Sequence, residues 1–158
     1  MGTIVGIAGP SGVGKTRVAE ELVGALAPRG VRTGYLKHAP HGFELDRPGS
    51  DSARLATAGA SAVAVVGNGR VYVTRAAPDD PAPMLEHLVT LGCDVVLVEG
   101  YHASPWPKIV VTSKATPERD VTGDVIARVR VERGAPHAGD LADAVDAIVA
   151  LMRGAPYA

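Results

Sequence analysis

Eight residues near the start of the chain could bind phosphate, because they match the Walker A pattern completely. Glycines in such a loop let the backbone turn tightly, with its N–H groups pointing at an anion. Lys15 would place a positive charge on the outer phosphates, and the Thr16 hydroxyl is suited to ligating a phosphate-bound magnesium ion. The residues that we expect to bind nucleotide phosphates are Gly9, Ser11, Gly12, Val13, Gly14, Lys15 and Thr16.

A second candidate ligand lies at the end of the apolar run 94–99, which predicts a buried strand with a terminal acid, Glu99. In a nucleotide-binding α/β fold this is the Walker B position, where a carboxylate holds magnesium directly or through water. Taken alone, Glu99 could be a surface residue at a strand end. Combined with the Walker A loop, it favours a magnesium site made by Thr16 and Glu99, with Asp46 as a further candidate that could equally be solvated.

The polar loop 37–50 is the natural place for a segment that senses the γ-phosphate or contacts a substrate or partner. Its candidate residues are Lys37, His38 and His41, together with Asp51 just beyond it. Asp51 could instead cap the helix that follows, as could Ser50. The spacing of His38 and His41 permits a metal site, but two histidines fall short of the three or four ligands of zinc. A polar substrate or partner surface is therefore favoured.

Hydrophobic periodicity predicts how these residues are positioned. An apolar strand precedes the Walker A loop, and a helix over 17–27 follows it. Asn68-Gly69 between two β-type runs predicts a hairpin. The other expected strands are 31–36, 94–99, 108–112 and 125–131, and the other expected helices are 50–58, one that ends at Leu91, and a last helix capped by Asp140.

Strands that alternate with helices and are apolar throughout predict an α/β fold of the P-loop NTPase type. Its mostly parallel twisted sheet is flanked by helices on both faces. The hairpin, about 62–75, is expected as an antiparallel addition at one edge of that sheet. With no linker-like segment along the chain, we expect residues 1–158 to form a single nucleotide-binding domain.

Composition excludes several other classes. Sixteen basic residues against seventeen acidic ones leave a net charge of −1, and 4% aromatic content offers few stacking platforms, so we expect no nucleic-acid partner. Without a basic cluster or an apolar run of transmembrane length, we expect no membrane partner. A single cysteine and no export segment at the N-terminus favour the cytoplasm.

Several motifs in order resemble the MobB family of molybdopterin-guanine dinucleotide biosynthesis adaptors over about residues 3–112. They are the Walker A loop, Gly34-Tyr35-Leu36-Lys37-His38, Asp46-x-Pro48-Gly49-x-Asp51-Ser52, Ala58-Gly59-Ala60, Leu97-Val98-Glu99-Gly100-Tyr101 and Lys108-Ile109-Val110. The resemblance implies a homodimer that binds GTP and Mg²⁺ and hydrolyses GTP slowly at most. It implies assistance to a guanylyltransferase that joins GMP to molybdopterin or to its molybdenum-bound form.

Two features depart from what the resemblance implies. The segment 128–133 lacks the Ser-Asp type of sequence found in family members, and the chain has no Asn-Lys-x-Asp guanine motif, although Thr112-Ser113-Lys114 follows a strand at a comparable place. Two alternatives stay open. The first is a small-molecule kinase, although 128–133 predicts a strand and turn rather than an arginine-bearing lid. The second is a nickel-type metallochaperone GTPase, although the chain has no histidine-rich tract.

Overall fold

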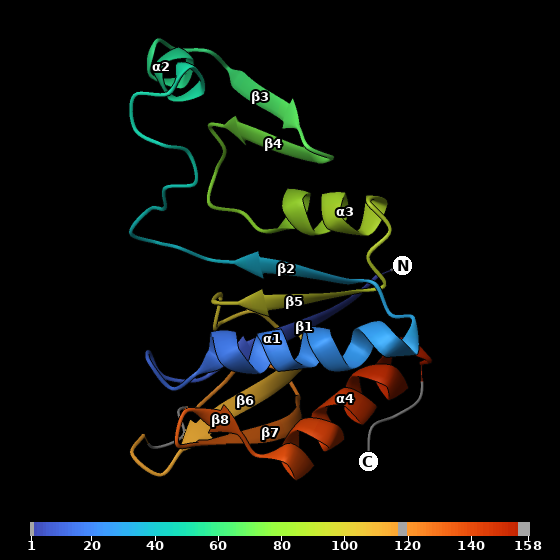
Figure 1. Cartoon of the computed structure of the whole chain (residues 1–158). Coiled ribbons are helices and arrows are strands. Elements are labelled where there is room, and N and C mark those ends of the chain that lie inside the picture. The colour runs from blue at the N-terminus through green and yellow to red at the C-terminus, as the bar shows by residue number, and fades with distance from the viewer. Residues whose placement is uncertain (1, 117–119, 155–158) are drawn as a thin grey trace. The chain divides into compact units, whose positions relative to one another are not determined.

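The computed structural model describes residues 2–116 and 120–154 and separates into two compact units (Figure 1). The first unit comprises residues 1–38 and 82–158, and the second comprises residues 39–81. The predicted single domain spans residues 1–158. Three parts of it lie outside the described residues: residue 1, residues 117–119 and residues 155–158. The single nucleotide-binding domain stays a prediction.

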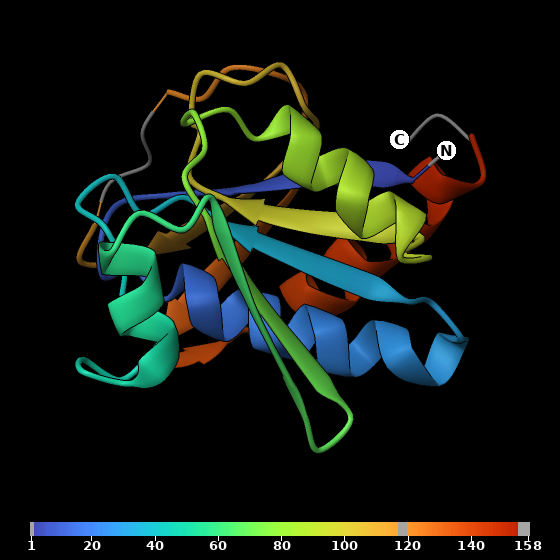
Figure 2. The same ribbon diagram turned by 90° about the horizontal axis from the view of Figure 1, so that it is seen from above.

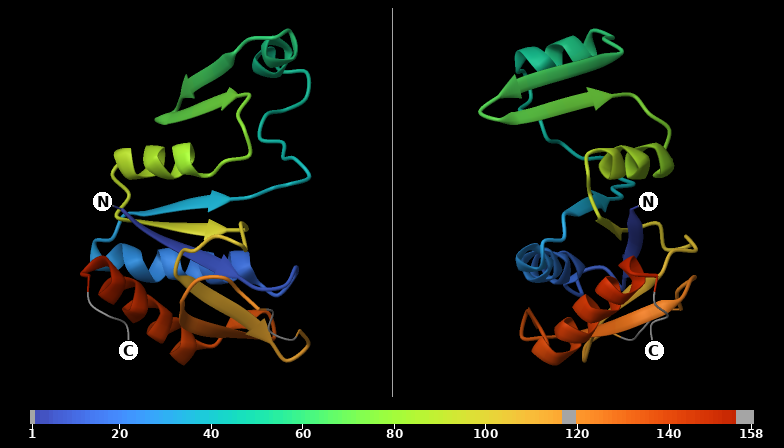
Figure 3. Two further views of the ribbon diagram at one scale, coloured as in Figure 1. Left: turned by 180° about the vertical axis from the view of Figure 1, so that it is seen from behind. Right: turned by 90° about the vertical axis from the view of Figure 1, so that its right-hand side faces the viewer.

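The first unit is built on a six-stranded sheet with the strand order β2-β5-β1-β6-β7-β8. Neighbouring strands are parallel except for the last pair. The carboxyl ends of β1, β2 and β5 therefore point to the same side of the unit, as Figure 3 shows. The strands are β1 (Thr3–Ala8), β2 (Thr33–Lys37), β5 (Val95–Glu99), β6 (Lys108–Ser113), β7 (Val125–Glu132) and β8 (Ala135–Pro136).

Helices cover both faces of this sheet, as predicted (Figure 2). The helices α1 (Lys15–Leu26) and α4 (Ala138–Met152) pack on one face, and α3 (Ala82–Thr90) packs on the other. A short 3₁₀ turn, Ala27–Arg29, which contains Pro28, follows the end of α1 at Leu26. Strand β5 shows why its sequence is apolar throughout: Val95 and Leu97 pack toward α1, whereas Val96 and Val98 pack toward α3.

The second unit contains α2 (Asp51–Thr57) and the hairpin of β3 (Ala62–Gly67) and β4 (Arg70–Arg75). Asn68 and Gly69 have φ angles of 48° and 70°, which confirms the predicted turn. The expectation that the hairpin extends one edge of the main sheet is wrong. The two strands form a separate sheet, because strand pairing is a long-range choice that a local alternation of residues does not encode.

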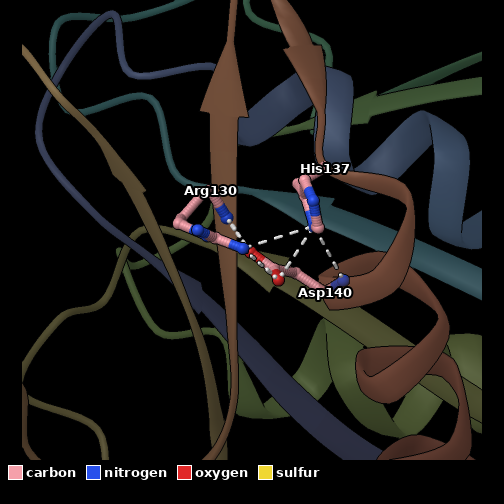
Figure 4. A network of polar contacts seen from close by, with 3 residues as sticks. All are labelled: Arg130, His137 and Asp140. Atoms are coloured by element: carbon pink, nitrogen blue, oxygen red, sulfur yellow. Dashed lines mark hydrogen bonds and ion pairs between the residues drawn. The ribbon is translucent and has the colours of Figure 1, made fainter.

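The start of α4 also differs from the prediction, because Asp140 is not its capping residue. His137 is the N-cap, and Asp140 lies in the first turn. The Asp140 carboxylate instead accepts hydrogen bonds from the backbone N, Nε and Nη2 of Arg130 at 3.0, 2.8 and 3.0 Å. Figure 4 shows this network of Arg130, His137 and Asp140, which ties the end of β7 to α4.

We expect Asp140→Ala to lower the free energy of unfolding by about 1.5 kcal/mol, the lower end for hydrogen bonds to charged groups, because the Arg130 side chain is half exposed. The hydrogen bonds from Arg130 hold the pKa of Asp140 well below its ordinary value. A carboxyl group with a lowered folded-state pKa stabilises the fold above its unfolded pKa of about 3.9 and loses that contribution as the pH falls.

The measurement is urea unfolding of the wild type and the variant at pH 7 and at successively lower pH, with Asp143→Ala as the matched control on an exposed site of the same helix. The difference between wild type and Asp140→Ala should shrink with acidification below about pH 4. Equal effects of the two substitutions at pH 7 would show that the Arg130 contact contributes nothing.

Within the described residues, no helix combines the length and the apolar character needed to cross a membrane.

Candidate functional site

The Walker A loop connects β1 to α1 and has the backbone shape that its glycines permit. Gly9, Gly12 and Gly14 have φ angles of 149°, 74° and 104°, a region that side-chain-bearing residues rarely adopt. Gly14 is the N-cap of α1 and has no side chain with which to cover the first-turn N–H groups. The positive end of the helix dipole and these N–H groups therefore remain available to an anion.

Lys15, in the first turn of α1, bends back over this loop. Its ammonium group donates to the carbonyl oxygens of Gly9 at 3.1 Å and Pro10 at 2.8 Å. The charge is thus held beside the N–H groups of the loop rather than extended into solvent. An anion bound by these N–H groups would meet the Lys15 ammonium at short range, where a charge-assisted contact is strongest.

Glu99 and Thr16, the two predicted magnesium ligands, are brought together. The Thr16 hydroxyl donates to Glu99 Oε2 at 3.0 Å. The Tyr35 hydroxyl donates to the same oxygen at 2.6 Å, and the Lys37 ammonium lies 4.0 Å from Oε1. The Glu99 side chain is only 12% exposed, so this carboxylate is a largely buried charge surrounded by donors.

The register of the sheet explains this cluster. Lys37 is paired with Glu99, and Tyr35 with Leu97, in the parallel ladder between β2 and β5. Side chains alternate along a strand, so Tyr35, Lys37 and Glu99 all point to the face that carries α1. Tyr35 was not among the predicted site residues. Its position two residues before Lys37 on a predicted strand was the available signal, but the pairing of β2 with β5 was needed to interpret it.

The donor set fits Mg²⁺, a hard cation that prefers oxygen ligands and is bound by one or two carboxylates together with substrate phosphates. Thr16 and Glu99 supply a hydroxyl and a carboxylate oxygen beside the loop. No group of three or more His, Cys, Asp and Glu side chains within the described part of the chain could hold a metal ion. Thr16 and Glu99 are the residues that would hold a magnesium ion here, together with oxygens of a bound phosphate.

A cavity of about 800 Å³ adjoins the loop on the side away from β2. Its walls are the loop residues 12–14, the segment 113–116 after β6, and residues 131–134 at the end of β7. A turn in which Arg133 and Gly134 have φ angles of 51° and 80° forms one side. The volume suits a nucleoside. The cavity is thus lined by Ser113 and Lys114, which follow a strand at the place comparable to the guanine motif, and by the end of the divergent segment 128–133.

The segment after Glu99 is fixed by a buried lysine. Lys108 is 1% exposed, and its ammonium donates to Ser104 O at 2.6 Å, Ser104 Oγ at 3.1 Å and Trp106 O at 3.3 Å. Burial lowers the pKa of Lys108. The same segment carries Tyr101, whose ring stacks on His38 at 4.2 Å between centroids. Lys108 thus holds the loop that places an aromatic ring against predicted site residue His38.

The remaining predicted residues, His41, Asp46 and Asp51, belong to the second unit. Ser50 caps α2 by accepting a hydrogen bond from the backbone N of Ala53, so Asp51 is not needed as the cap and its carboxylate is exposed. Asp46 accepts hydrogen bonds from Ser52 Oγ and Arg47 N, which lower its pKa. The roles of these three residues beside phosphate or magnesium stay predictions.

Comparison with known proteins identifies close relatives. Residues 4–130 match the family model described as molybdopterin guanine dinucleotide synthesis protein B, MobB. The chain is 37% identical over 105 residues to the molybdopterin-guanine dinucleotide biosynthesis adapter protein of Escherichia coli, covering 64% of this chain and 60% of that protein. It is 35% identical over 126 residues to the adapter protein of Haemophilus influenzae, covering 74% and 69% of the respective chains. The aligned region thus spans between 60 and 69% of these two relatives.

Solved structures show the same fold. The crystal structure of Bacillus subtilis MobB superimposes with a TM-score of 0.70 at 30% identity, covering 94% of this chain and 96% of that one. A MobB homologue from Bacillus stearothermophilus has a TM-score of 0.57 at 23% identity, covering 96% of both chains. The latter likeness concerns the fold alone. Together they confirm the predicted α/β fold of mostly parallel strands.

Proposed function

Since this chain belongs to the MobB family, we propose that it is a GTP- and magnesium-binding adaptor that assists a guanylyltransferase in joining GMP to molybdopterin or its molybdenum-bound form. The observation that carries the nucleotide part is the hydrogen bond of 3.0 Å between Thr16 and Glu99 beside the Walker A loop. These two residues are 83 positions apart in sequence, and the fold brings them together where phosphate-bound magnesium would lie.

The contacts in the structure suggest a separate role for each group of residues. The N–H groups of 11–16, at the loop and the first turn of α1, bind phosphate oxygens, and Lys15 neutralises the outer phosphates. Thr16 and Glu99 would hold Mg²⁺, which would offset the charge of the phosphates. The cavity of about 800 Å³ bounded by 113–116 and 131–134 receives the nucleoside. We propose slow magnesium-dependent hydrolysis at most, with Lys37, His38, His41 and Asp51 serving a partner or its ligand.

The test is a reconstituted reaction that contains the guanylyltransferase, molybdopterin, GTP and Mg²⁺, with and without this protein. Formation of the guanine dinucleotide is followed over time. We expect the protein to raise the yield or rate while forming no dinucleotide when incubated without the transferase. No stimulation at concentrations that saturate GTP binding would contradict the adaptor function.

Substitutions in the predicted partner residues separate nucleotide binding from stimulation. We expect His38→Ala and Asp51→Ala to reduce stimulation and to change GTP affinity by less than about fivefold, which is about 1 kcal/mol. The calorimetric GTP titration and the reconstituted reaction are run on the same preparations. A kinase would behave differently: GTP- or ATP-dependent phosphorylation of a small acceptor by the isolated protein would favour that alternative, and both substitutions would then abolish it.

We propose that the adaptor is a homodimer that uses its hairpin. Four valines of the hairpin are between 46 and 76% exposed: Val65, Val66, Val71 and Val73. Among the described residues, β3 and β4 pair only with each other, and an isolated two-stranded hairpin is marginally stable in water. Val66, Val71 and Val73 lie on one face of the hairpin and Val65 on the other, so pairing with a second copy would cover the three-valine face and an open strand edge.

Sedimentation at micromolar concentration should therefore give twice the chain mass of 16.2 kDa. Val71→Lys should shift the protein to the monomer, because it places a charge among the exposed valines. Val23→Lys, which changes a valine on the solvent side of α1, is the matched control and should leave the mass unchanged. A monomeric wild type would refute the dimer.

A further inference from the structure

We propose that Tyr35 is a positioning residue for the magnesium site, holding one oxygen of Glu99 so that the other is presented to a metal-bound water. This inference rests on the proposed binding of a nucleotide with Mg²⁺. Tyr35 is in β2 and does not belong to the Walker A loop or the Walker B strand. Its hydroxyl makes the shortest contact to the Glu99 carboxylate, at 2.6 Å.

The two short hydrogen bonds to Glu99 converge on the same oxygen. Thr16 Oγ1 and Tyr35 Oη both donate to Oε2, at 3.0 and 2.6 Å, whereas Oε1 has the Lys37 ammonium at 4.0 Å. A hydroxyl that donates its proton keeps its lone pairs for another partner. Thr16 therefore directs a lone pair away from Glu99, toward a cation. Because Oε2 already accepts two hydrogen bonds, Oε1 is the oxygen that can accept from a water bound to that cation.

Tyr35 is suited to this task because it stays a donor. The ordinary pKa of a tyrosine phenol is about 10, so the hydroxyl keeps its proton throughout the physiological range. Its aromatic ring restricts the hydroxyl to few positions. The neighbouring cation, Lys37, is more than half exposed at the side chain and lies farther away, so it cannot fix the carboxylate in the same manner.

Removing this hydroxyl should weaken the binding of Mg²⁺ more than the binding of the nucleotide alone. In Tyr35→Phe the ring remains, and Oε2 keeps only the longer bond from Thr16. The carboxylate then gains freedom to rotate, and the oxygen that faces the metal-bound water is no longer fixed. Residues that orient metal ligands from outside typically contribute about 10-fold or more to metal affinity.

The experiment measures GTP affinity by calorimetry in excess Mg²⁺ and in EDTA, and takes the ratio as the magnesium enhancement. The proteins are the wild type, Tyr35→Phe, Glu99→Gln, the double variant, and Tyr72→Phe, which removes a tyrosine hydroxyl from β4. We expect Tyr35→Phe to lower the enhancement about 10-fold, with affinity in EDTA within about twofold of the wild type. Tyr72→Phe should match the wild type.

The double variant tests whether Tyr35 acts through Glu99. Tyr35→Phe should have no further effect on the enhancement in the Glu99→Gln background, because residues that act through one interaction are not additive. Additive effects would overturn the inference. An equal loss of affinity in Mg²⁺ and EDTA would also overturn it, since Tyr35 would then only support the fold. If the wild type binds GTP with enhancement and Tyr35→Phe is unchanged, the inference alone fails. If the wild type binds no GTP, the proposed function fails with it.

Discussion

Lys15→Ala is expected to weaken binding of GTP by about 10- to 150-fold, which corresponds to about 1.5–3 kcal/mol for a hydrogen bond to a charged group. In the structure the Lys15 ammonium is held 2.8 Å from the Pro10 carbonyl, directly beside the loop that would carry the phosphates. Alanine keeps the helix and removes the charge. Calorimetric titration of GTP in the presence of Mg²⁺ measures the change.

The matched control is Arg17→Ala, which removes one positive charge from the same turn of α1. The Arg17 guanidinium pairs with Glu20 and Glu21 on the exposed side of the helix, at 3.3 and 2.7 Å. It does not contact the loop carbonyls, so its loss should change GTP affinity by less than about threefold, the range of a screened surface charge. A folded Lys15→Ala protein with unchanged affinity would refute phosphate binding by this loop.

The contrast with GDP gives this prediction a second readout. If Lys15 acts on the outermost phosphate, the loss of affinity should be larger for GTP than for GDP, because the charge that it neutralises is absent from the diphosphate. Equal losses of affinity for the two nucleotides would show that the Lys15 ammonium contacts a phosphate that GTP and GDP share. Either result uses the same two proteins and requires no partner enzyme.

Local sequence was sufficient wherever a structure depends on neighbouring residues. Asn68-Gly69 predicts its hairpin because both positions need a positive φ angle. The apolar run 94–99 predicts β5 because a central parallel strand is buried on both faces, and its end at Glu99 predicts the acid beside Thr16. Ser50 was one of two candidate caps for α2, and its hydrogen bond to Ala53 N confirms it.

Local sequence could not predict which distant segments of the chain pair with each other. Tyr35 reaches Glu99 only because β2 lies beside β5, across 64 residues of chain. Asp140 has the residue type and place of a helix cap, but Arg130 takes its carboxylate. Lys108 begins an apolar strand and would be expected at the surface, yet three oxygen acceptors from residues 104–106 let it be buried. In each case the fold determines the partner of a polar side chain.

Gly9→Ala is expected to have the largest effect on the fold itself, lowering the free energy of unfolding by about 3 kcal/mol or more. Gly9 has a φ angle of 149°, and a Cβ atom there would lie 2.5 Å from the carbonyl oxygen of Val111 in β6. This neighbour is backbone of a central strand and cannot move aside without disturbing the sheet. The cost therefore combines an unfavourable backbone conformation with a steric overlap.

Gly12→Ala is the matched control within the same loop. Its φ angle of 74° is also unfavourable for alanine, but among the described residues no heavy atom beyond its two chain neighbours lies within 4 Å of the added Cβ. The cost there should be about 1 kcal/mol, the backbone penalty alone. Urea unfolding of both variants measures the difference, and equal losses of stability would contradict the overlap with Val111. Because the Gly9 carbonyl also accepts from Lys15, a displaced loop should lower GTP affinity in Gly9→Ala more than in Gly12→Ala. The close approach of the loop to β6 would then support both the sheet and the phosphate site.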